Sequence, residues 1–362
     1  AVIREIQPQI LINNRTGIPE DFATPEQFIP PTGITNPDGT PKLWESCITL
    51  TTGHGSHQPT AWWGYDKNET EFKTPEFSIH MLIDVVSKGG NLLLNVGPTP
   101  QGTIRPEEVE VLEAIGEWLK VNGEAIYETT ASPFRHLPFY GKATVKGNTL
   151  YVHVFDWPED HRLTLPGVRN SVRDAWLVAD PNVKLKTERA GSDLIVDLPQ
   201  EAPDQIASVV AFRLDGPPEV DPFTIRPDKD GVLVLPALLA EIHGSHGQHA
   251  WFEAAGGEIY VKEWTNKDDY VLWQFETEKG GSYEIVLSYA APVGGGRFEF
   301  AIGDKKLERT VSETGSPTKW TSEKLGQIEV PAGTNTLTVK PLDILKDAAL
   351  MNLHMVTLKP VN

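Results

Sequence analysis

The stretch Ser87-Lys88-Gly89-Gly90-Asn91-Leu92-Leu93-Leu94-Asn95-Val96-Gly97-Pro98-Thr99-Pro100 decides how the first third of the chain folds. It joins the end of an amphipathic run to a glycine pair, a short apolar run and a sharp turn. Just upstream, Thr74-Pro75-Glu76 supplies an N-cap threonine, a proline at the first helical position and an acidic first turn. We therefore predict a helix over residues 75–87, a glycine stop and a strand over residues 91–96.

The same alternation of helix and strand continues on both sides of this stretch. Residues 44–52 are rich in β-forming residues, and residues 10–14 form a short apolar run between turn signals, so we predict a strand at each. Pro106 opens a second amphipathic helix that stops near residues 122–123. Strands that alternate with helices predict parallel βαβ units, as in a barrel or a parallel sheet.

The pattern changes after residue 133 to short alternating stretches separated by turn residues. Residues 134–215 have the spacing of a small antiparallel β-sandwich, residues 216–222 form a proline-rich linker, and the remainder is again all-β. We predict an α/β segment followed by two antiparallel β-sandwich domains, over residues 1–133, 134–219 and 220–362.

The composition of the chain limits which binding partners and which cellular compartments are expected. The net charge of −18 disfavours binding to a phosphate backbone, so nucleic acid is not an expected partner. No run approaches the ~18–20 apolar residues of a membrane helix. The single cysteine, Cys47, excludes an intrachain disulfide and is expected to be a small buried residue. No signal peptide is visible, and we expect that a preceding segment is absent from this chain.

Several residues of the first third fit the chemistry of sugar hydrolysis. That reaction needs two carboxyl groups across the glycosidic bond and aromatic faces that pack on sugar C–H groups. The candidates are Glu26 in a Thr-Pro-Glu sequence, Glu45 beside Trp44, the pair Trp62 and Trp63, and Arg15 at a strand end. Each has a simpler reading by itself: a solvated loop glutamate, a packed tryptophan, or an arginine paired with a loop carboxylate.

Together these motifs are specific. Residues 1–133 resemble the second half of the catalytic barrel of glycoside hydrolase family 29, the retaining α-L-fucosidases. The matching sequences lie at residues 11–15 (Leu-Ile-Asn-Asn-Arg), 21–27, 44–49 (Trp-Glu-Ser-Cys-Ile-Thr), 63–65 (Trp-Gly-Tyr), 87–100 and 116–127.

The resemblance implies a (β/α)₈-like barrel followed by a β-sandwich, and it assigns roles to residues. Arg15 would contact the fucose, and the aromatic positions Trp44 and Trp63 would line its pocket. The acid/base would be Glu26 or Glu45, with Glu26 favoured because a flexible loop can bring it over the site. No metal or organic cofactor is needed. His54 and His57 fall in an apparent insertion, as solvated loop residues or as part of a leaving-group subsite.

The motifs that belong to the first half of the family's barrel are missing from this chain. The family's nucleophile is an aspartate on an earlier barrel strand, and neither Asp21 nor Asp38 lies in such a motif. A half-barrel would also expose parallel strand edges. We therefore expect an N-terminal barrel-half, either on a second polypeptide or in a segment absent from this chain. A rebuilt half-barrel with a different role stays open.

The resemblance implies an exo-acting α-L-fucosidase that removes terminal fucose from glycans or glycoconjugates, secreted or periplasmic in a bacterium. The alternatives are a non-catalytic carbohydrate-binding protein and a structural, stabilising fragment. The last domain resembles accessory carbohydrate-binding modules, in which Trp264 would be a sugar platform. In some such domains an early glutamate holds Ca²⁺, which makes Glu241 a candidate ligand.

Overall fold

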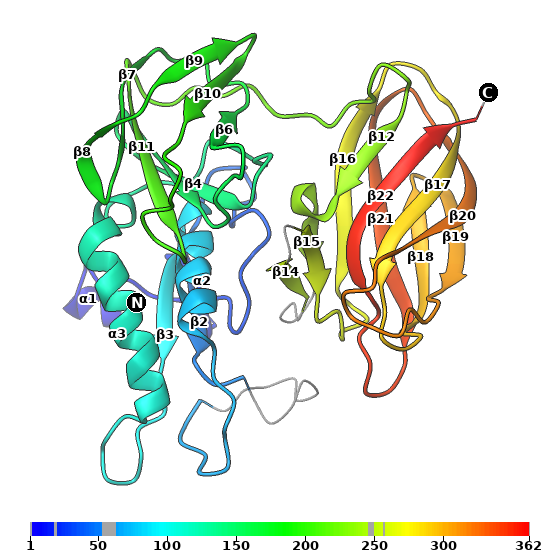
Figure 1. Ribbon diagram of the computed structural model, residues 1–362. Coiled ribbons are helices and arrows are strands. Elements are labelled where there is room, and N and C mark those ends of the chain that lie inside the picture. Colours follow the sequence, from blue (N-terminus) through cyan, green and yellow to red (C-terminus); the bar gives the residue numbers. More distant parts are fainter. Residues whose placement is uncertain (1, 18–19, 53–62, 245–249, 256–257, 362) are drawn as a thin grey trace.

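The computed structural model describes residues 2–17, 20–52, 63–244, 250–255 and 258–361. The protein is mostly β-sheet with few helices, and its sheets fall into three groups along the chain (Figure 1). The first group is parallel, and the other two are antiparallel.

The first group is a three-stranded parallel sheet in the order β1-β2-β3, with helices beside it. Its elements are α1 (Val2–Ile6), η1 (Asn14–Thr16), β1 (Phe22–Ala23), β2 (Leu43–Thr49), α2 (Pro75–Ser87), β3 (Asn91–Asn95), α3 (Pro106–Asn122) and η2 (Gly123–Ala125). The predicted helix over residues 75–87 is confirmed. The predicted strand over residues 10–14 is wrong, because the Asn13 side chain accepts a hydrogen bond from the Arg15 amide and starts the short helix η1. Only Asn13 bridges to Phe22 of β1.

The turn from α2 into β3 is built by local chemistry. The Thr74 hydroxyl accepts a hydrogen bond from the Phe77 amide at 3.1 Å and caps the start of α2. At the other end Gly90 N–H donates to the Val85 carbonyl at 3.0 Å. A Cβ at Gly90 would lie 2.5 Å from the Trp44 indole, so glycine lets the chain pass over this ring. The quoted stretch therefore packs β3 directly beside β2.

The second group consists of two antiparallel sheets that share a core. One has the order β4-β5-β11-β7-β8 and the other β6-β10-β9. Their bounds are β4 (Gly141–Lys146), β5 (Thr149–Val154), β6 (Arg162–Leu165), β7 (Val172–Leu177), β8 (Asp180–Lys184), β9 (Thr187–Ala190), β10 (Asp193–Asp197) and β11 (Ser208–Leu214).

The larger of these sheets is covered on both faces. Its inner face packs in a core that includes Val152 and Phe212, and its outer face packs with Ile79 of α2 and Trp118 of α3. The Trp118 indole donates a hydrogen bond to the carbonyl of Ala207 at 2.9 Å. The helices of the first group therefore rest on the sheet of the second.

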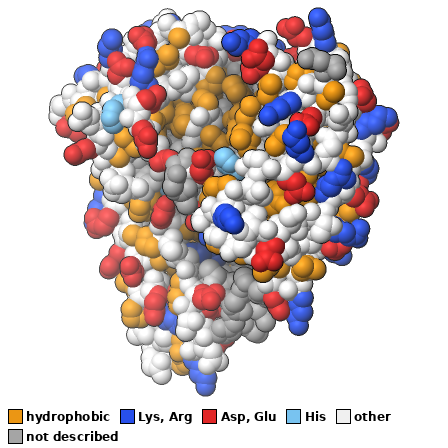
Figure 2. Space-filling view, turned by 45° about the vertical axis from the view of Figure 1, so that its right-hand side comes forward, with side chains coloured by type: hydrophobic (Ala, Val, Ile, Leu, Met, Phe, Trp, Pro, Cys, Tyr) orange, Lys and Arg blue, Asp and Glu red, His pale blue; other side chains and the backbone are white. Residues whose placement is uncertain are grey.

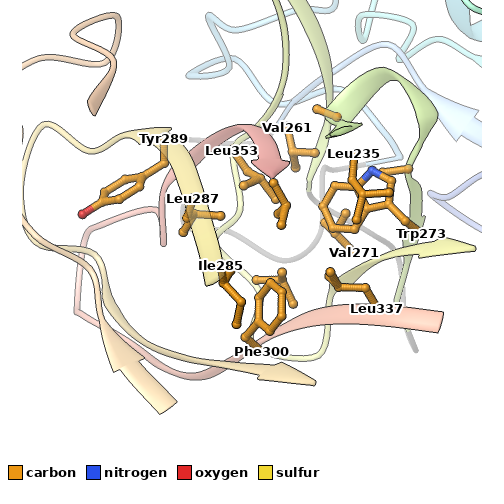
Figure 3. Close-up of a cluster of buried hydrophobic side chains, with 14 of the residues drawn as sticks. Leu235, Val261, Val271, Trp273, Ile285, Leu287, Tyr289, Phe300, Leu337 and Leu353 are labelled. Atoms are coloured by element: carbon orange, nitrogen blue, oxygen red, sulfur yellow. The ribbon is translucent and has the colours of Figure 1, made fainter. Parts of the chain in front are cut away.

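The third group is a pair of antiparallel sheets around the largest apolar core (Figure 3). Their orders are β14-β15-β22-β17-β20, with β12 beside β22, and β13-β16-β21-β18-β19. The elements are β12 (Leu233–Pro236), η3 (Ala237–Leu239), β13 (Glu241–His243), β14 (Trp251–Ala255), β15 (Glu258–Lys262), β16 (Tyr270–Thr277), β17 (Gly281–Ala290), β18 (Gly296–Ile302), β19 (Lys305–Thr310), β20 (Thr321–Val330), β21 (Gly333–Ile344) and β22 (Asn352–Pro360).

Trp264 belongs to this core. Its side chain is 0% exposed, and its indole N–H donates to the Asp269 carbonyl at 3.0 Å. A sugar platform needs an exposed ring face, so the expected accessory sugar-binding role of Trp264 is corrected to a packing role.

Glu241 lies where the second and third groups meet. Its carboxylate accepts hydrogen bonds from Arg135 Nε at 2.7 Å and from His243 Nε2 at 3.0 Å, and Arg135 Nη1 reaches Gln274 at 2.8 Å. The carboxylate of Glu241, the candidate calcium ligand, is therefore engaged by protein side chains. Within the described ranges, no group of three or more metal-ligating side chains is present.

Charges of both signs are intermingled on the face of the molecule shown in Figure 2. Among the helices that the structure describes, none is both long and apolar enough to cross a bilayer.

Candidate active site

The candidate site occupies the open face of the parallel sheet. Along β2, Trp44 and Ser46 are buried on the face behind the sheet, whereas Glu45 and Cys47 alternate onto the other face and are half-buried. The parallel register places Glu45 beside Asn91 and Cys47 beside Leu93 of β3. Leu93 is 47% exposed, so this face of the sheet is open in the chain.

Arg15 and Glu26 form an ion pair at the edge of this face. Arg15 Nη1 lies 2.8 Å from Glu26 Oε2, and both side chains are nearly half exposed. Arg15 Nε donates to the Thr24 hydroxyl at 3.1 Å, and that hydroxyl donates to Asn14 Oδ1 at 2.6 Å. The Asn-Asn-Arg and Thr-Pro-Glu motifs are therefore neighbours in space as well as in sequence.

Cys47 connects this pair to Glu45. Glu26 bridges to Cys47 in a parallel sense, and the Gln27 amide donates to the Cys47 carbonyl at 2.9 Å. Burial raises the pKa of the Cys47 thiol, and the charges of Arg15, Glu26 and Glu45 all act on it. The structure thus gathers both candidate carboxylates and the candidate cation around one strand position.

The two tryptophans have different surroundings. The Trp44 ring is 2% exposed and packs on Gly90 behind the sheet, away from Glu45. This placement corrects the expectation that Trp44 lines a pocket. Trp63 is half-buried, and its carbonyl accepts a hydrogen bond from Asn95 Nδ2 at 2.8 Å, which holds it at the carboxyl end of β3. His54, His57 and Trp62 lie outside the described residues.

Sequence reasoning missed the residues that hold the Trp63 loop. Asn95 Nδ2 also donates to the Thr49 hydroxyl at 2.9 Å, so one amide joins the ends of β2 and β3 to the loop. A Cβ at Gly97 would lie 2.9 Å from the Gly64 backbone, so glycine allows the two segments to meet. The signal for both was the Asn-Val-Gly sequence at the end of a predicted strand.

Arg105, at the start of α3, secures the next part of the same loop. It donates to the carbonyls of Asp66 and Glu69, the latter at 2.7 Å, and its guanidinium lies 4.6 Å from the centre of the Tyr65 ring. A cation over an aromatic face is attractive. The loop that carries the Trp-Gly-Tyr motif is therefore fixed at both of its described ends.

Asp21 and Asp38 are engaged elsewhere. The two oxygens of Asp21 accept hydrogen bonds from Arg4 at 2.8 and 2.7 Å, which, with the Ile12 amide, lower its pKa. Asp38 accepts hydrogen bonds from the Thr40 hydroxyl and amide at 2.6 and 3.0 Å. Neither aspartate is placed to serve the cluster around Cys47.

This segment matches a known family. Residues 1–124 match the family model described as Alpha-L-fucosidase. The first third of the chain is therefore similar to alpha-L-fucosidases. Among named relatives, the tissue alpha-L-fucosidase of Bos taurus is 33% identical over 177 residues, which cover 47% of this chain and 36% of the relative. The plasma alpha-L-fucosidase of Homo sapiens is 44% identical over 91 residues, which cover 25% of this chain and 18% of the relative.

Solved alpha-L-fucosidases resemble the structure over different lengths. Isoenzyme 1 of Paenibacillus thiaminolyticus has a TM-score of 0.53 at 36% identity, covering 59% of this chain and 52% of that one. The enzyme of Vibrio sp. strain EJY3 has a TM-score of 0.60 and covers 99% of this chain and 62% of that one, but at 22% identity it shows a shared fold alone. The chain spans about a third of the length of the curated relatives it matches, such as the 36% of the Bos taurus enzyme.

Proposed function

We propose that this chain forms one wall of the active site of an exo-acting retaining alpha-L-fucosidase that hydrolyses terminal alpha-L-fucose of glycans or glycoconjugates. The observation that carries the proposal is the convergence of Arg15, Glu26 and Glu45 around Cys47 in a segment that matches the alpha-L-fucosidase family. The alternative of a non-catalytic sugar-binding protein was motivated by the missing nucleophile and by Trp264. Because Trp264 is buried, it no longer supports that alternative.

In this proposal one of the two glutamates is the acid/base. It donates a proton to the leaving-group oxygen and then deprotonates the water that attacks the glycosyl-enzyme intermediate. Glu26 is favoured, because its carboxylate is 43% exposed at the edge of the open face, where a substrate can reach it. Arg15 holds Glu26 in the free chain and would contact the sugar, and Trp63 would supply an aromatic wall. The chemistry requires no metal or cofactor.

The nucleophile aspartate and the rest of the barrel would come from an N-terminal barrel-half, on a partner chain or in another part of a longer protein. The support is the exposure of large apolar side chains in the first group of elements, where Ile6 is 75%, Leu11 65% and Leu43 61% exposed. Exposed apolar patches of this kind mark interaction sites. A secreted or periplasmic location fits the plasma enzyme named among the relatives.

Glutamine substitutions in a longer polypeptide that includes this chain test the acid/base assignment. An aryl fucoside with a good leaving group needs little protonation, whereas a natural glycoside needs much. Glu26→Gln should lower the kcat of natural glycosides by about 10²–10⁴-fold and that of aryl fucosides far less. Glu45→Gln is the companion variant, because Glu45 is the other candidate, and the selective loss should appear in only one of the two. Similar small losses for both substrates in both variants would remove both glutamates from this role.

A further inference from the structure

A second surface, at the opposite end of α3 from the turn that follows β3, has the features of a ligand site. It includes part of the sequence Asn122-Gly123-Glu124-Ala125-Ile126-Tyr127, a family motif that the candidate active site does not use. A helix that follows a parallel strand runs back along the sheet. The carboxyl end of α3 therefore lies away from the strand ends that carry Glu26 and Trp63, and Figure 1 shows it beside β8.

Two adjoining cavities lie at this end of α3. One, of about 480 Å³, is lined by Glu124, Asp174, Trp176, Pro181, Lys184 and Arg213. The other, of about 460 Å³, shares Glu124 and Pro181 with it and adds apolar and aromatic walls from Leu119, Val121, Tyr127 and Val178. Both are open to solvent, so they are depressions of the surface and not enclosed pockets. The shared residues make the two cavities one groove.

Among the described residues, two charged groups that line the groove lack polar partners. In the part of the chain that the structure describes, neither the Arg213 guanidinium nor the Glu124 carboxylate has a hydrogen bond or salt bridge, although Arg213 lies 5.8 Å from the centre of the Trp176 ring. Both act on Tyr151, whose pKa is raised by burial and by Glu124 and lowered by Arg213. The guanidinium and the carboxylate both line the first cavity, where one can donate to a ligand and the other can accept from it.

The groove balances its charges. Lys184 is paired with Asp174 at 2.6 Å, Lys120 of the second cavity is paired with Glu117, and Arg213 is matched in number by Glu124. Such a site offers no net attraction to an ion, but it offers strong donors and acceptors beside aromatic rings. The Tyr127 side chain is 59% exposed, so an aromatic surface is available in the second cavity.

We propose that this groove is a second carbohydrate site, which takes a neutral oligosaccharide of at least two rings away from the candidate active site. Arg213 and Glu124 hydrogen-bond the hydroxyls of one ring, and Tyr127 packs on the C–H face of the next. The site does not depend on the proposed hydrolytic function, because its residues are separate from Arg15, Glu26 and Glu45.

Calorimetry on the purified chain with lacto-N-tetraose tests the proposal. This neutral tetrasaccharide contains no fucose, so its binding does not report on a fucose pocket. We expect saturable binding, which Arg213→Ala and Glu124→Gln each weaken about tenfold or more, the value of one hydrogen bond to a charged group. Tyr127→Ala should weaken binding as well.

Arg173→Ala is the matched control, because Arg173 is exposed on the same strand as Trp176 and does not line the groove. It should leave affinity within about twofold, and thermal melting should show all four variants folded. Absence of binding at about 10 mM sugar, or equal affinity of the wild type and the Arg213 and Glu124 variants, would overturn the proposal. Loss of fucosidase activity with binding intact would leave it standing.

Discussion

Replacement of Glu241 by glutamine should loosen the third group of sheets from the second. Glu241 is 9% exposed, and it accepts hydrogen bonds from Arg135 and His243. Burial alone would raise its pKa, but these hydrogen bonds and the charge of Arg135 outweigh burial and lower the pKa from 4.5 to about 2. His136 is 3.8 Å away, and burial lowers its pKa to about 4, so it is neutral at pH 7.

The size of the effect follows from this pKa. A drop from 4.5 to about 2 corresponds to about 3 kcal/mol of unfolding free energy, since one pKa unit is about 1.4 kcal/mol. Arg135 is 45% exposed, so solvent screening reduces the expected loss to about 2 kcal/mol. Because the folded pKa lies below the unfolded one, this contribution is complete above pH 4.5 and is lost as the pH falls toward 2.

Urea unfolding and calorimetry of wild type and Glu241→Gln at pH 7, 5 and 3 provide the assay. The stability difference should be about 2 kcal/mol at pH 7 and should shrink in acid. Glu276→Gln is the control, because its ion pair with Arg226 is exposed and should contribute less than about 1 kcal/mol. A Glu241 variant as stable as wild type at pH 7, or a difference that grows in acid, would refute the reasoning.

Two further predictions concern packing and acid stability. Gly90→Ala would place a Cβ 2.5 Å from the Trp44 ring and should lower the free energy of unfolding by about 1–3 kcal/mol. Gly116→Ala has open space around it in α3 and should raise the free energy of unfolding by up to about 1 kcal/mol. Urea midpoints equal to that of the wild type would contradict both expectations. Burial lowers the pKa of His153 from 6.5 to about 3, so folding excludes a proton, and stability falls as the pH drops from 6.5 toward 3. His153→Gln should flatten the dependence of Tm on pH in that range, and an unchanged profile would contradict this explanation.

The helices of the first group were predictable because their signals are local. The cap at Thr74, the proline at position 75 and the glycine pair at 89–90 are all adjacent to the element they delimit. The apolar run at residues 10–14 was predicted as a strand, but a local signal overrides it. The side chain of Asn13 caps the short helix η1 and turns the chain before a strand can form. Local sequence signals therefore explain both the correct prediction of the helix at residues 75–87 and the wrong prediction of a strand at residues 10–14.

The candidate site was predictable in part. Arg15 and Glu26 were selected from motifs, and the structure pairs them at 2.8 Å. Asn95 was missed because its amide acts on Thr49 and Trp63, which are 46 and 32 residues away in sequence. The burial of Trp264 could not be read from the sequence, because an aromatic residue in the segment between two strands, here β15 and β16, does not reveal whether its ring turns into the core.

The most direct test of the central claim is hydrolysis of 4-nitrophenyl-α-L-fucoside by two proteins: this chain alone and a longer polypeptide, or co-purified complex, that adds the N-terminal barrel-half. Intact mass under denaturing conditions identifies the polypeptides in each sample. The account predicts turnover by the longer protein or complex and none by the chain alone. Turnover by the 362-residue chain alone, or inactivity of the longer protein, would contradict the account.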